Sequence, residues 1–164
     1  MSLSHVERYK KLLKFESEAN RRTLESLASV PASQREKPQY DRAMQLLPHN
    51  LIARRVWLHR VKGETYENPT DWFPRWTLDR QEQEEQAIHN LWHPFVHTLA
   101  EPDLLRDVHY TSSEGQKYAS SLDEILTHVF NHSTYHRGQI ARLVSECGGK
   151  RATTDYIALT RRSL

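Results

Sequence analysis

The helical period of the hydrophobic residues constrains the fold of this chain more than any other feature. Turn-forming residues fall at wide intervals, and between them apolar residues recur every three or four positions rather than every two, which favours helices over strands. The pattern predicts long helices at about 4–29, 41–62, 78–100 and 121–147. Long helices with connections of medium length favour an all-α, up-down four-helix bundle.

Proline and glycine mark irregularities within this plan. Gly63 is a natural residue to end the second helix. Pro48 and Pro94 lie inside predicted helices, where proline removes a backbone donor, so we expect a kink or a helix restart at Pro48 and a bend at Pro94. The segment 107–120 has β-prone residues on both sides of Gly115, which predicts a short hairpin before the last long helix. The C-terminal tail is expected to form a short docked helix.

Length and composition limit the classes of protein. A chain of 164 residues is sufficient for one domain, covering 1–164. No apolar run approaches the length of a membrane span, so no membrane partner is expected. The first residues lack the apolar stretch of a secretory signal, which predicts a cytoplasmic protein. The net charge of +2 gives little reason to expect a nucleic-acid partner.

Residue usage points to imidazole chemistry. The chain has ten histidines and one cysteine, Cys147. A single cysteine excludes an intrachain disulfide and a cysteine-based zinc cluster, so any metal site must use histidine or carboxylate ligands. Cys147 itself is expected to be a packed or idle thiol.

Helix geometry identifies which histidines point inward. Each residue turns the helix by about 100°, so His136 falls within the apolar arc of the last helix, His132 about 20° outside it and His128 about 40° further out. His132 and His136 have the i, i+4 spacing with which a helix holds a transition metal. His49 lies about 20° from Val56 on the apolar face of the second helix. Three inward imidazoles would supply three nitrogen ligands and leave one coordination position open.

A rival series has the same spacing on the third helix. It consists of His89, His93 and His97, which lie about 100–180° around the helix from Ile88 on the apolar face. We therefore expect these three side chains to face solvent. An inward histidine can also be an ordinary hydrogen-bonded core residue, and from the residues alone both interpretations of the inward set stay open. Glu16 and Asn20 interrupt the apolar face of the first helix and also need buried partners.

The segment from His128 to Gln139, HVFNHSTYHRGQ, resembles the helix-four signature of the DinB/YfiT-like superfamily of metal-binding four-helix bundles. There an HxxxHRGQ element supplies two ligands, and the third comes from the second helix ahead of a Trp-Leu pair. His49, ahead of Trp57 and Leu58, matches that context, and the segments 110–126 and 153–159 also match. The resemblance implies that His49, His132 and His136 bind one divalent transition metal per chain, zinc or nickel, and that the protein forms homodimers.

The resemblance also implies an activity. Some members of the superfamily are S-transferases for low-molecular-weight thiols, so the first hypothesis is a metal-dependent thiol transferase with a small-molecule substrate. Metal-dependent hydrolysis is the enzymatic alternative, and a dimeric metal-binding stress-response module without turnover is the non-enzymatic one.

Three further side chains of the signature have expected roles near the metal. Gln139 either orients a ligand or makes a hydrogen bond between helices, and Arg137 either contacts a substrate carboxylate or forms a salt bridge. His128 is a third candidate for contact with a ligand or substrate. Gly138 suggests the close approach of another backbone.

Overall fold

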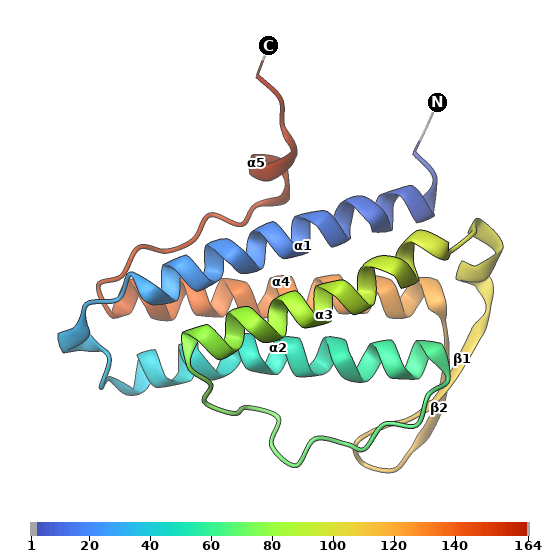
Figure 1. Cartoon of the computed structure of the whole chain (residues 1–164), viewed down its shortest axis with the longest axis horizontal. Coiled ribbons are helices and arrows are strands. Elements are labelled where there is room, and N and C mark those ends of the chain that lie inside the picture. The colour runs from blue at the N-terminus through green and yellow to red at the C-terminus, as the bar shows by residue number, and fades with distance from the viewer. Residues whose placement is uncertain (1–2, 164) are drawn as a thin grey trace.

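The computed structural model describes residues 3–163 and shows a bundle of four long helices (Figure 1). The helices are α1 (His5–Ala28), α2 (Pro38–Lys62), α3 (Leu78–Thr98) and α4 (Leu122–Glu146). Two short 3-10 turns, η1 (Ala32–Gln34) and η2 (Glu101–Leu105), lie between them, and a short helix, α5 (Tyr156–Thr160), follows. The all-α bundle predicted from the periodicity is therefore confirmed.

The chain direction of the helices is set by a long crossover connection. α1 and α2 each pack mainly against α3 and α4, so α1 and α2 lie diagonally across the bundle. α2 and α3 run in the same direction because residues 63–77 return along the length of the bundle between them (Figure 1). An extended connection of this length can span about 50 Å, more than the roughly 37 Å of a 25-residue helix such as α2. The four helices therefore run in the order up-down-down-up.

The predicted hairpin is present and leads directly into α4. Strands β1 (Asp107–Thr111) and β2 (Lys117–Ser121) pair antiparallel, with His109 opposite Ala119. Gly115 turns the chain with a φ of 84°, a left-handed conformation that favours glycine. Ser121 ends the hairpin and caps α4, because its hydroxyl accepts a hydrogen bond from the Glu124 amide.

Local signals account for most helix ends. Thr77 caps α3 as Ser121 caps α4, and Gly63 ends α2 with a φ of 69°. α2 begins at Pro38, three residues before its predicted start, because proline suits the first helical position. The helix continues unbroken through Pro48, so the restart considered there does not occur. Within residues 3–163, no helix combines the length and apolarity needed to cross a membrane.

The bundle interior contains buried charges as well as an apolar core. Leucine, valine and isoleucine side chains from all four helices pack around Trp92. Among them, Glu16, Arg54 and Arg137 are at most 2% exposed. A guanidinium nitrogen of Arg137 lies 2.7 Å from Glu16 and 3.2 Å from the Asn20 side-chain oxygen. Glu16 and Asn20 therefore find their buried partner on α4.

Candidate metal centre

Three histidines from two helices meet inside the bundle. His49 comes from α2, and His132 and His136 come from successive turns of α4. Their ring centroids are 4.6–5.1 Å apart, and one potential ligand nitrogen from each lies within 4.8 Å of the other two. Among residues 3–163, this is the one group of three histidine, cysteine or carboxylate side chains with metal-ligand spacing.

Hydrogen bonds orient two of the rings toward a common point. Nδ1 of His49 donates to the backbone oxygen of Trp72 at 2.9 Å, because a carbonyl oxygen can only accept. Nδ1 of His136 donates to Oε1 of Gln139 at 3.1 Å. In a neutral imidazole whose Nδ1 carries the proton, Nε2 has the free lone pair. Nε2 is therefore the available ligand atom of His49 and of His136, as expected for metal-binding histidines.

The spacing of one pair of nitrogens suits a small transition ion. Nε2 of His49 lies 3.3 Å from Nε2 of His132. A tetrahedral ion with bonds of about 2.0–2.1 Å to nitrogen separates its ligand atoms by about 3.3 Å. The cluster contains no carboxylate or thiolate ligand. Three imidazoles suit zinc, nickel, copper or iron rather than magnesium or calcium, which prefer oxygen.

The protein environment keeps the three imidazoles neutral. Burial, together with the neighbouring His136 and His49, lowers the pKa of His132 to about 4. Burial is also the main cause of the lowered pKa values of His49 and His136, and the positive charge of Arg42 adds to the effect on both. Only neutral imidazole has a lone pair to give to a metal, so at neutral pH the site is prepared for an ion.

The crossover connection covers one side of the site, which the helical pattern of the sequence did not indicate. Phe73 stacks on the His49 ring at 4.2 Å, next to the Trp72 carbonyl that orients the same ring. The guanidinium of Arg42 lies 4.3 Å from the centre of the Phe73 ring. Arg42 is exposed, and no carboxylate of residues 3–163 lies within ion-pair distance of it. The one available sequence signal was the aromatic cluster at 72–76, in an otherwise polar connection.

The other candidate residues of the signature have distinct surroundings. The His128 ring is 5.5 Å from His132 and 5.4 Å from Trp57, beside the cluster but outside it. Gln139 contacts His136 as described above. Arg137 is buried and bonded to Glu16, so its guanidinium is already engaged inside the bundle. Gly138 has open space where a side chain would begin, so no backbone approaches it.

The residues outside the signature are placed as follows. In the rival series, His93 and His97 are exposed and His89 is half-buried. Cys147 is buried at the end of α4 and packs in the apolar core.

Comparison with known proteins agrees with this architecture. The sequence model of the DinB family matches residues 1–162. The chain is also similar to Protein DinB of Bacillus subtilis (strain 168), with 46% identity over 37 residues. That match covers 23% of this chain and 22% of the length of the Bacillus protein. No solved structure gave a significant match.

Proposed function

The chain belongs to the DinB family, and on that premise we propose that it is a divalent-metal enzyme that transfers a low-molecular-weight thiol to an electrophilic small molecule. The observation that carries the proposal is the convergence of three neutral imidazoles, in two of which a hydrogen bond at Nδ1 leaves the lone pair on Nε2. Such a donor set fits one zinc or nickel ion per chain, held by His49, His132 and His136.

A divalent ion on three neutral ligands keeps its full charge, and when bound it acts as a Lewis acid that lowers the pKa of a coordinated thiol or water. In the proposed transfer, the S–H bond of the thiol and the bond from the acceptor carbon to its leaving group break. A sulfur–carbon bond forms, and the proton and the leaving group go to water. The reaction needs no oxidant or reductant.

The side chains around the cluster would position these reactants. Trp72 and Gln139 hold two of the rings, and Phe73 shields the His49 ring from water. Arg42 provides a positive charge without a carboxylate partner among the described residues, which suits the carboxylate of a small thiol or acceptor. His128 stands beside His132 as a neutral polar contact for the substrate. Arg137 has no part in this scheme because its guanidinium donates a hydrogen bond to Glu16 inside the bundle.

Metal analysis of untagged protein tests the first part of the proposal. We expect about one zinc or nickel ion per chain, and loss of that ion in His136→Ala. His93→Ala is the matched control, because it removes an exposed histidine of α3 outside the cluster. Retention of the ion by a folded His136→Ala variant would reject the site.

A conjugation screen tests the second part. Monobromobimane is incubated with the loaded protein and small thiols such as cysteine or glutathione, and thioether formation is followed by fluorescence. We expect metal-dependent acceleration that Arg42→Gln weakens for carboxylate-bearing thiols. A loaded protein that accelerates no thiol would favour the alternatives, a hydrolase using the same site or a metal-binding module without turnover. Sedimentation of the same protein tests the homodimer that we also propose.

A further inference from the structure

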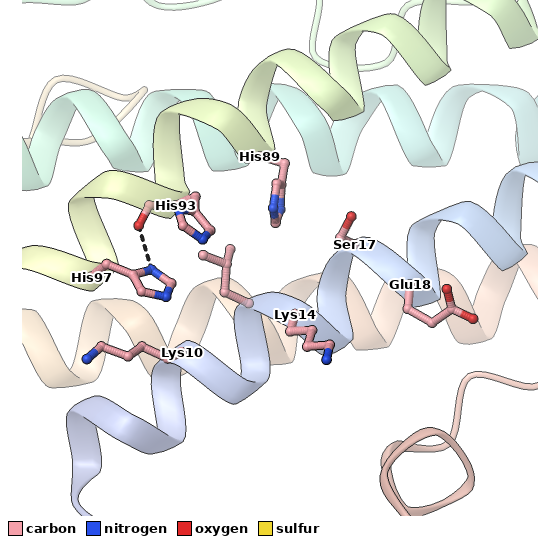
Figure 2. A pocket seen from close by; sticks show the side chains of 8 residues that line it. Lys10, Lys14, Ser17, Glu18, His89, His93 and His97 are labelled. Atoms are coloured by element: carbon pink, nitrogen blue, oxygen red, sulfur yellow. Dashed lines mark hydrogen bonds between the residues drawn. The ribbon is translucent and has the colours of Figure 1, made fainter.

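We propose that the groove between α1 and α3 is a second ligand site, separate from the histidine cluster, which binds a small multivalent oxyanion such as a phosphate group. The groove has a volume of about 430 Å³. α1 contributes Lys10, Lys14 and Ser17, and α3 contributes the series His89, His93 and His97 (Figure 2).

The three histidines form a continuous row of hydrogen-bonding groups. Their spacing of four residues places them on one face of α3, and Figure 2 shows that this face is turned toward α1. The rings of His93 and His97 stack with centroids 3.9 Å apart, and the His89 ring is 5.8 Å from that of His93. Nδ1 of His97 donates to the His93 carbonyl at 2.8 Å, so its Nε2 can donate to an anion when the ring is protonated.

The charges of α1 make the groove positive. Lys10 contacts Glu7 near the surface, whereas no carboxylate of residues 3–163 lies within ion-pair distance of Lys14. Glu18, the acidic residue that lines the groove, is held by Arg21 and Arg22. Its charge is therefore already balanced. An oxyanion in the groove would meet two ammonium groups, the hydroxyl of Ser17 and the imidazole row, all of which can donate hydrogen bonds.

His89 lines the groove and has an unsatisfied ring nitrogen. Nδ1 of His89 is shielded from solvent and has no hydrogen-bond partner. Unpaired buried polar atoms are rare, and they are expected where water or a ligand completes the structure. The guanidinium of Arg54 lies close enough to His89 for its charge to add to burial in lowering the pKa of that ring.

The same features argue against a metal in this groove. The row lacks the three-ligand spacing that the other cluster has. The ammonium groups of Lys10 and Lys14 would repel a cation. The charged groups that face the row are Lys10, Lys14 and Glu18 from α1, Arg54 from α2, and Glu85 one turn earlier on α3. Cations outnumber acids in this set, and Arg54 lies 3.9 Å from Glu85.

Titration with inorganic phosphate and pyrophosphate tests the proposal. Calorimetry at constant ionic strength is expected to show one saturable site per chain. Lys14→Gln and the double variant His93→Gln/His97→Gln should each weaken binding at least about tenfold, because each removes charge-assisted hydrogen bonds. The matched controls Lys117→Gln and His109→Gln change exposed residues of the hairpin and should leave the affinity unchanged. All substituted side chains are exposed or half-buried, and circular dichroism verifies that each variant folds.

Two further comparisons separate this site from the metal centre. In His132→Ala, phosphate binding should persist, because the groove does not include that residue. Binding of sulfate, which keeps both negative charges over this range, should tighten several-fold when the pH is lowered from 7.5 to 6.0, because anion binding favours protonated imidazole. Equal losses in the hairpin controls, or loss of phosphate binding in His132→Ala, would overturn the proposal. Zinc that binds in the groove, and binds more weakly at low pH, would also overturn the proposal, since that behaviour identifies a cation site.

Discussion

Replacing Arg137 with methionine distinguishes an internal ion pair from a substrate contact. Methionine fills much of the same space but removes the charge. In the structure, Arg137 donates to Glu16 at 2.7 Å, to the Asn20 oxygen at 3.2 Å and to the Thr134 hydroxyl at 3.1 Å. Burial alone would raise the pKa of Glu16, but the charges of Arg137 and Arg54 outweigh it and hold that pKa below its ordinary value. The variant therefore leaves a buried carboxylate without its nearest cation.

The size of the effect follows from this environment. Removing one partner of a buried pair costs about 3–5 kcal/mol. Arg54 still lies 3.9 Å from Glu16, so we expect the lower end of that range, about 3 kcal/mol. For a domain of this length, that loss corresponds to a decrease in melting temperature of about 6–12 °C.

Urea unfolding of the metal-free protein, followed by circular dichroism, measures the loss. Arg142→Met is the matched control, because Arg142 forms an exposed ion pair with Glu146 on the same helix. Such pairs contribute about 0–1 kcal/mol. The double variant Glu16→Gln/Arg137→Met should lose at least about 1 kcal/mol less than the sum of the single variants, since it removes both charges together. A variant Arg137→Met that is as stable as Arg142→Met, but loses thiol transfer, would refute the internal ion pair.

Three other predictions concern metal, pH and glycine. Zinc at about 100 times its dissociation constant should stabilise the metal-free protein by about 2.7 kcal/mol, measured as a rise in melting temperature that His136→Ala abolishes. The metal-free protein should lose stability as the pH falls from 6.5 toward 4. The pKa of His132 is about 4 in the folded protein, so the unfolded chain binds more protons in that interval. Urea midpoints that stay constant across this range would contradict the prediction. Gly138→Ala should stabilise the protein by about 0.5–1 kcal/mol, because the site is open and helical. Gly149→Ala should destabilise it by about 1–3 kcal/mol, because its new Cβ would meet Val144 at 2.7 Å and Val30 at 2.8 Å. Equal unfolding midpoints for the two variants would contradict both expectations.

Sequence patterns predicted the elements that depend on neighbouring residues. Short-range signals account for the end of α2 at Gly63, the start of α4 at Ser121 and the hairpin around Gly115. The angular positions of His49, His132 and His136 also follow, because a helix turns by a constant angle at each residue. The start of α2 was placed three residues late because Pro38 was not recognised as a first helical residue.

Contacts between distant segments could not be derived in this way. The parallel course of α2 and α3 is one such feature. The others are two hydrogen bonds: His49 to the Trp72 carbonyl spans 23 positions in the sequence, and Arg137 to Glu16 spans 121. Similarly, the histidine face of α3 was assigned to solvent, yet this face and α1 enclose the groove with Lys14 and His93. Periodicity along a helix shows which side of it is apolar. Which other segment lies against that side depends on the packing of the whole chain, because helix–helix contacts form between surfaces that no local pattern connects.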